Sequence, residues 1–145
     1  MRLWHESMIP YLDRQRLLGQ HRECCALRGA GWGRKHATVN YVFEAPPEKL
    51  VAYHKLVMRE MRERGYNPDP LWETSTYRGQ KLGFQEDWVN DRKVEQYLDE
   101  TLTEKIHTIY NEHNLPYLVE CVNNLREKGV DYPYEKPQDI QTKND

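Results

Sequence analysis

The chain has 145 residues, of which 38% are apolar and 30% are charged, and its net charge is −2. This length is enough for one domain with a hydrophobic core, and sixteen aromatic residues exclude a wholly disordered chain. No apolar run approaches the ~18 residues of a membrane span, and the first dozen residues lack the apolar core of a secretory signal. We therefore expect a cytoplasmic protein with no membrane partner.

Cysteine and histidine are present, but not at the spacings typical of zinc sites. The three cysteines, Cys24, Cys25 and Cys121, are odd in number and form no C-x-x-C pair, and the six histidines form no H-E-x-x-H pattern. We expect reduced thiols and no metal site.

Positive charge is concentrated in the first quarter of the chain. Residues 1–36 carry seven Lys or Arg against three acids, a local charge of +4, so the remainder carries −6. The asymmetry predicts a polyanionic partner on one face of the molecule.

The basic segment is predicted to be helical. Asp13 can cap a helix that begins near Arg14, and an apolar stripe follows at spacings of three and four residues. The stripe consists of Leu17, Leu18, His21, Cys24, Cys25 and Leu27. Arg22 and Glu23 lie off it, and on spacing alone they are most simply a solvated helix face.

A glycine-rich loop, GAGWG at residues 29–33, ends this helix and leads into Arg34, Lys35 and His36. The loop is neither a Walker A motif nor a dinucleotide fingerprint. Its backbone amides and the two cations after it could still approach phosphates closely.

The rest of the chain indicates further helices. Pro46 and Pro47 open a second helix that Gly65 ends, and His54 on its apolar face is expected to be a core histidine. The preceding TVNYVF segment is expected to be a short strand or an extended connector.

Two more helices are expected in the second half, one from about Asn90 to His113 and one over residues 116–128. The predicted fold is all-α, a compact single domain of about four helices with long loops. We expect this domain to occupy residues 1–135 and a polar, flexible tail to occupy residues 136–145.

The sequence LDRQRLLGQHRE at residues 12–23 resembles the pyrimidine-dimer DNA glycosylases, the family of the phage endonuclease V. The resemblance extends from the N-terminal Met-Arg-Leu to the KHATVNYVFEAPPEKLVAYHKLVMREMRERGYN stretch, so it covers about the first 67 residues. Its most specific part is the pattern Gln15-x-x-Leu18-x-x-x-Arg22-Glu23, followed by the His36 segment.

The resemblance implies excision of UV-damaged pyrimidines and strand cleavage at the resulting abasic site, without metal or organic cofactor. The family's nucleophile is its N-terminal α-amine, which forms an imine with the sugar. Met1 takes that place here, because Arg2 aligns with the family's N-terminal arginine and its bulk should prevent removal of Met1. Glu23 matches the glutamate that stabilises the cationic sugar and moves protons, and Arg22 is the third catalytic candidate. The residues expected to contact DNA are Arg2, Gln15, Arg16, His21, Arg28, Arg34, Lys35 and His36.

Elementary chemistry is consistent with these roles. An α-amine has a pKa of about 7.7, and cations such as Arg2 and Arg22 should lower it. The chain departs from the family at Ala26, where a second catalytic-site arginine is expected, and only faintly repeats the family's aromatic, basic tail. The sequence therefore leaves three candidate substrates, which are a pyrimidine dimer, another damaged base and an abasic site alone.

Two other functions fit the same charge pattern. The first is a non-catalytic DNA-binding module that uses the basic N-terminal segment, although phosphate binding alone gives no role to Glu23. The second is a helical interaction protein without nucleic acid, which the acidic remainder favours. Trp4 and Trp32 could stack on a base or be packing residues. The expected partner is damaged double-stranded DNA, and the expected state is a monomer.

Overall fold

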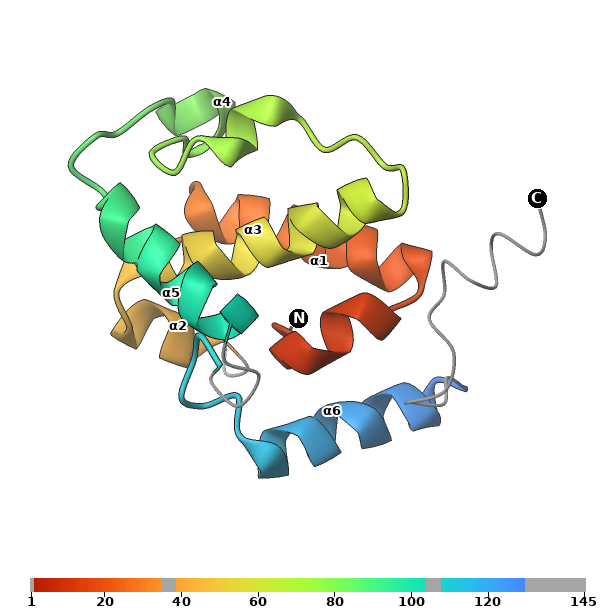
Figure 1. Ribbon diagram of the computed structural model, residues 1–145. Coiled ribbons are helices and arrows are strands. Elements are labelled where there is room, and N and C mark those ends of the chain that lie inside the picture. The colour runs from red at the N-terminus through yellow and green to blue at the C-terminus, as the bar shows by residue number, and fades with distance from the viewer. Residues whose placement is uncertain (1, 35–38, 104–107, 130–145) are drawn as a thin grey trace.

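The computed structural model describes residues 2–34, 39–103 and 108–129. Within these ranges the chain is helical and forms no strand, and Tyr77 and Phe84 make one isolated bridge. The all-α prediction is confirmed (Figure 1). The elements are η1 (Glu6–Tyr11), α1 (Arg14–Arg28), α2 (Asn40–Glu44), α3 (Pro47–Glu63), η2 (Pro70–Glu73), α4 (Gly79–Leu82), α5 (Asp91–Thr103) and α6 (Leu115–Glu127). The expectations for Met1, Lys35, His36 and the tail fall outside the described residues.

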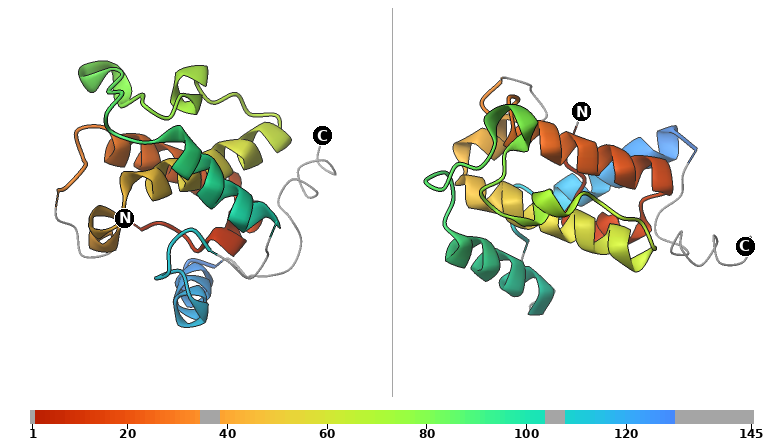
Figure 2. Two further views of the ribbon diagram at one scale, coloured as in Figure 1. Left: turned by 60° about the vertical axis from the view of Figure 1, so that its left-hand side comes forward. Right: turned by 90° about the horizontal axis from the view of Figure 1, so that it is seen from above.

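Helix α3 is the central element of the fold. It packs against α1, α2, α5 and η1, and the views in Figures 1 and 2 show it running through the middle of the molecule. Its start agrees with the prediction, because Pro47 occupies the first turn, and it ends shortly before Gly65, whose φ is +86°. Its buried side chains are Glu48, Leu50, Val51, Ala52, Tyr53, His54, Val57, Met58, Glu60 and Met61. Burial on nearly all sides explains why this helix organises the core.

The N-terminal arm, residues 2–12, is part of the core rather than a loose extension. Leu3, Met8 and Leu12 are almost fully buried. The arm lies between α3 and α6 (Figure 1), and it is fixed from both sides. The hydroxyl of Tyr53 on α3 donates to the carbonyl of Trp4 at 2.5 Å, and that of Tyr117 on α6 donates to the carbonyl of Leu3 at 2.6 Å.

Two sequence predictions about local structure are wrong. The segment expected to be extended contains the short helix α2. The described part of the helix expected over residues 90–113 is α5, Asp91–Thr103, whereas residues 108–113 are not helical and form bends and turns. The physical reason is tertiary: Tyr110 is fully buried, and its backbone N–H donates to Glu6 in the N-terminal arm at 3.3 Å. That contact takes precedence over the local helical periodicity.

Helix α6, by contrast, agrees with its prediction within one residue at each end. The side chain of Asn114 accepts a hydrogen bond from the backbone N–H of Tyr117 and so caps its N-terminus. None of the helices in the described ranges is both long enough and apolar enough to cross a membrane.

Candidate active site

A cavity of about 480 Å³ lies between the N-terminal arm, α1 and α6. It brings together five of the residues that the sequence singled out, Arg2, Gln15, Arg16, Arg22 and Glu23. The remaining lining residues are Trp4, Gly19, Gln20, Asn124 and Lys128. The predicted catalytic pair and several predicted DNA contacts therefore share one concave surface.

The lining of this cavity has an excess of positive charge. Four lining residues are cationic, Arg2, Arg16, Arg22 and Lys128, and Glu23 is the one carboxylate among the lining residues. Arg22 is exposed, while Arg16 lies 2.9 Å from the carboxylate of Asp13. A surface of this kind attracts phosphates, and a single carboxylate within it can oppose a positive charge that develops on a bound sugar.

Gln20, which sequence reasoning did not identify, holds the N-terminal arm against α1. Its Oε1 accepts from the backbone N–H of Trp4 at 2.7 Å, and its Nε2 donates to the carbonyl of Arg2 at 3.1 Å. Gln20 is 3% exposed and lies one helical turn before Glu23. Its spacing from Leu17 and Cys24 places it on the buried stripe of α1, and a polar residue at such a position indicates a buried hydrogen bond.

Arg2, the first residue that the structure describes, is thereby fixed through its backbone carbonyl. The guanidinium of Arg2 is itself held, since it lies 3.7 Å from Glu120 and 3.9 Å from the Sγ of Cys121, both on α6.

Trp4 and Trp32, which the sequence allowed either to stack on a base or to be packing residues, have different surroundings. Trp4 is 7% exposed and lies between two cations, with Arg2 5.7 Å and Lys128 5.5 Å from its ring centre. Trp32 is half-buried and makes an edge contact with Trp88. Trp4 is therefore a packing residue that forms part of the cavity wall rather than an exposed wedge.

The expectation that Arg28 contacts DNA is wrong. Its side chain is fully buried, and its guanidinium donates to four backbone carbonyls in η2 and the loop that follows it. These carbonyls belong to Trp72, Thr74, Ser75 and Tyr77. Burial lowers the pKa of Arg28 to about 10, which still leaves it charged at neutral pH. Its position explains the error: seven residues, close to two helical turns, separate Arg28 from His21, so both face α3 rather than the cavity.

His21 does not line the cavity either. Its Nδ1 lies 2.8 Å from the Nε2 of His54, and burial lowers the pKa of both rings, that of His54 well below its ordinary value. Arg28 can only donate, so the 3.0 Å contact makes the Nδ1 of His54 an acceptor. The Nε2 of His54 then carries the proton and donates to His21, which confirms His54 as a hydrogen-bonded core histidine.

The side chain of Cys25 lies close to this histidine pair, and the three candidate ligand atoms are within 4.8 Å of one another. Sequence spacing did not predict such a group. Metal-bound histidines normally donate from their other ring nitrogen to an acceptor, whereas here Arg28 donates to His54. The hydrogen bonds account for the short contact without an ion, and we assign no metal site to it.

The basic loop is positioned next to the end of α1. The backbone N–H of Gly31 donates to the carbonyl of Ala26 at 2.9 Å, and a Cβ at Gly31 would lie 2.7 Å from that same oxygen. This close approach requires glycine. Arg34 is exposed but does not line the cavity, so the structure does not join the described part of the loop to the site around Glu23.

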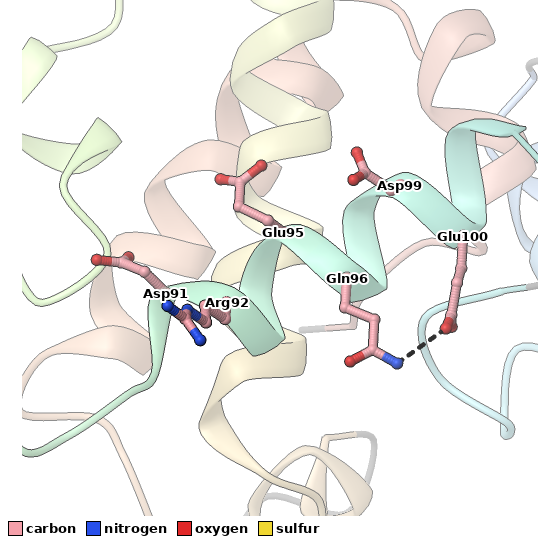
Figure 3. Close-up of a pocket in the computed structure, with 6 residues that line it drawn as sticks. All are labelled: Asp91, Arg92, Glu95, Gln96, Asp99 and Glu100. Carbon is pink, nitrogen blue, oxygen red and sulfur yellow. Dashed lines mark hydrogen bonds between the residues drawn. The ribbon is translucent and has the colours of Figure 1, made fainter.

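A second depression, on α5, does not suit DNA. All six residues that line it come from that one helix, and Figure 3 shows them along its outer face. Asp91, Glu95, Asp99 and Glu100 make it acidic, and no other element contributes to its lining. Phosphates would be repelled there.

The family model described as pyrimidine dimer DNA glycosylase matches residues 1–74, slightly more than half of the chain. The chain belongs to the pyrimidine dimer DNA glycosylase family. No curated protein and no solved structure is similar enough to the chain to count as a match. The matched part includes the arm and α1, and thus every cavity residue except Asn124 and Lys128.

Proposed function

We propose that this protein excises UV-damaged pyrimidines from double-stranded DNA and then cleaves the strand at the abasic site. Membership of the family supports the first activity. The observation that carries the proposal is the cavity itself, which Glu23 lines together with several cations, among them Arg2, whose backbone carbonyl is held by Gln20.

The α-amine of Met1 is the proposed nucleophile. Its neutral form attacks C1′ of the damaged nucleotide, and the bond from C1′ to the base breaks, with the base taking the bonding electrons and then a proton. The bond between C1′ and the ring oxygen opens next, which leaves an imine between Met1 and the sugar and a hydroxyl group on C4′.

Loss of a proton from C2′ then expels the 3′ phosphate and breaks the strand. Water hydrolyses the imine and releases the amine.

Glu23 has two roles in this sequence. Its carboxylate stabilises the positive charge that develops on the sugar, and it shuttles protons between the amine, the ring oxygen and C2′. Arg22 and Arg16 bind the flanking phosphates, which holds the sugar against the carboxylate. No metal or organic cofactor takes part in these steps.

The proposed basis of lesion recognition is deformability. A damaged step is easier to kink and unstack than an intact one, by a few kcal/mol. The cationic lining supplies contacts to phosphates that are independent of sequence.

Borohydride trapping tests the proposal. The protein is incubated with duplexes that carry either a pyrimidine dimer or an abasic site, and borohydride then reduces any imine to a stable covalent complex. We expect trapping on both duplexes and its loss when the N-terminus is extended by a short peptide.

Glu23→Gln should lower the trapping rate by about 10²- to 10³-fold, the usual effect of removing one electrostatic stabiliser of a transition state. Glu86→Gln, at an exposed position outside the cavity, is the matched control and should trap like the unmodified chain. Intact DNA binding without trapping on either duplex would refute the enzyme and leave a non-catalytic DNA-binding module. Trapping on the abasic duplex alone would restrict the activity to the lyase step.

A further inference from the structure

His113 is a fully buried histidine in the non-helical stretch between α5 and α6, well beyond residues 1–74 that the family model matches. Its ring is surrounded by aromatic rings from the N-terminal arm, α2, α3, α6 and its own segment. The centres of these rings lie 5.0–5.8 Å from its own, and they belong to His5, Tyr41, Tyr53, Tyr110 and Tyr117. One side chain thus joins parts of the fold that are far apart in the sequence.

Both ring nitrogens of His113 have polar neighbours. Nδ1 lies 3.0 Å from Oε1 of Glu6 in the arm, whose side chain is also buried, and Nε2 forms a 2.7 Å hydrogen bond with the hydroxyl of Tyr41 on α2. A carboxylate accepts hydrogen bonds, so the ring carries its proton on Nδ1 and Nε2 accepts from Tyr41. The backbone N–H of Tyr110 donates to the same Oε1 at 3.3 Å. Residues 108–113 therefore hold the carboxylate of Glu6 at two points.

The two tyrosines that hold the backbone of the arm also pack on His113. The ring of Tyr117 lies nearly parallel to it, at 19°, and the ring of Tyr53 meets it edge-on, at 78°. Their hydroxyls donate to the carbonyls of Leu3 and Trp4. Because protein interiors are close-packed, a different side chain at position 113 would move both tyrosines and, with them, the two carbonyls.

We propose that His113 is a positioning residue for the reaction, because it sets where the arm, which carries the proposed nucleophile, lies relative to Glu23. The inference rests on the proposed function for the identity of the reaction. Arg2 and Trp4 of the arm line the cavity together with Glu23, so a shift of the arm changes the cavity itself. His113 is fully buried and does not line the cavity, so it acts only through the arm.

His113 and Gln20 hold the arm at different places. Gln20 ties the backbone of Arg2 and Trp4 to α1, whereas His113 ties the side chain of Glu6 to residues 108–113. A segment attached at one place can pivot about it, while two separate attachments also fix its direction. Reacting groups need this degree of definition, since an error of about 1 Å in their placement can cost about 10²-fold in rate.

The polar character of the pair supports a geometric role. A buried polar or ionic pair adds little net stability compared with apolar side chains of similar volume, whereas it accepts only one arrangement of its partners. Glu6 and His113 occupy buried positions where apolar residues would also pack. The pair therefore defines the place of the arm more than it stabilises the fold.

Single-turnover borohydride trapping on the abasic duplex, over a range of excess protein concentrations, separates the rate of chemistry from the affinity. Fluorescence anisotropy with a duplex that carries a non-cleavable tetrahydrofuran analogue of the abasic site measures the affinity alone. His113→Leu should lower the trapping rate constant at saturating protein by about 10- to 100-fold. The affinity should be nearly unchanged, because the cavity lining keeps all of its cations.

His113→Asn tests whether the contact with Glu6 matters or only the filling of space. The amide nitrogen of asparagine is as many bonds from Cβ as Nδ1 of histidine, so it can donate to Glu6 although the bond to Tyr41 is lost. His113→Asn should therefore trap faster than His113→Leu. A residue that only filled space would give the opposite order, because leucine is larger and apolar.

Val94→Ala, at a fully buried position on α5, is the matched control for a general loss of stability. Each protein is assayed well below its own Tm, and Val94→Ala should then trap like the unmodified chain. Should His113→Leu not fold, Glu6→Gln decides in its place, since it keeps the size of the side chain and an acceptor for Tyr110. It should trap about ten-fold more slowly with nearly unchanged affinity.

The outcomes separate this inference from the proposed function. If the unmodified chain traps, and the variants at positions 6 and 113 trap at its rate, slow no more than Val94→Ala or lose only affinity, His113 is not a positioning residue and the proposed function stands. If the unmodified chain traps on neither duplex, the proposed function fails, and the inference fails with it.

Discussion

Replacement of Gln20 by methionine tests whether the position of the N-terminal arm limits the chemistry. Gln20→Met keeps an unbranched side chain of similar size but removes the hydrogen bonds to Arg2 and Trp4, together with one that Gln20 accepts from Tyr53 at 2.9 Å. Tyr53 retains its bond to the carbonyl of Trp4, and the carbonyl of Arg2, only partly buried, can be rehydrated. The backbone N–H of Trp4 is left buried without an acceptor.

The structure sets the size of this effect. One unmet buried donor costs about 1–3 kcal/mol, and the other lost bonds add about 1 kcal/mol, so we expect a destabilisation of about 2–4 kcal/mol. A typical domain stability of about 5–15 kcal/mol leaves the variant folded at room temperature. A displacement of about 1 Å at a reacting group can cost about 10²-fold in rate, so trapping should slow far more than the stability loss explains.

The assay is single-turnover borohydride trapping on an abasic duplex with excess protein, well below Tm, beside anisotropy with the tetrahydrofuran duplex. Gln20→Met should trap about 10- to 100-fold more slowly with nearly unchanged affinity, because the amide is buried within the fold. Gln20→Glu keeps the acceptor for the backbone N–H of Trp4, so its trapping rate should lie between those of Gln20→Met and the unmodified chain. If Gln20→Met has a lower Tm but traps at the rate of the unmodified chain, the arm does not position the nucleophile.

The other predictions concern the core. Arg28→Met should destabilise the fold by about 3–5 kcal/mol in urea unfolding, because four carbonyls lose their donor. The control Arg59→Met, at an exposed position, should change stability by less than about 0.5 kcal/mol. Equal destabilisation by the two variants would contradict the buried role of Arg28. The lowered pKa of His54 means that the unfolded state binds a proton below pH ~6.5 that the folded state does not, so stability should fall by up to about 1.4 kcal/mol per pH unit as the pH drops below that value. His54→Asn should flatten this dependence, and an unchanged slope would contradict the assignment. Since burial raises the pKa of Cys25 to about 12, the native protein should react slowly with a thiol reagent at pH 8 and yield its three thiols after denaturation; rapid native reaction would contradict the described burial.

Much of the candidate site could be predicted because it depends on one helix. The positions of Arg22 and Glu23 relative to Gln15 follow from helical geometry, and the structure places all three on the same cavity. Helical geometry could also have separated Arg22 from Arg28, since six residues correspond to a large rotation around the helix axis. Local charge counting does not make this distinction, because it treats every arginine of a basic helix as a surface cation.

The sequence by itself determined the all-α class, the positions of α1, α3 and α6, and the concentration of positive charge at the N-terminus, because helical periodicity and charge are local properties. The tertiary structure decided that residues 108–113 are not helical, which arginine is buried, and how Gln20, Asn124 and Lys128 enter the cavity. These depend on contacts such as that between Tyr117 and Leu3, which are 114 residues apart. Such contacts form only when the N-terminal arm packs between α3 and α6, and no local pattern in either segment specifies the partner.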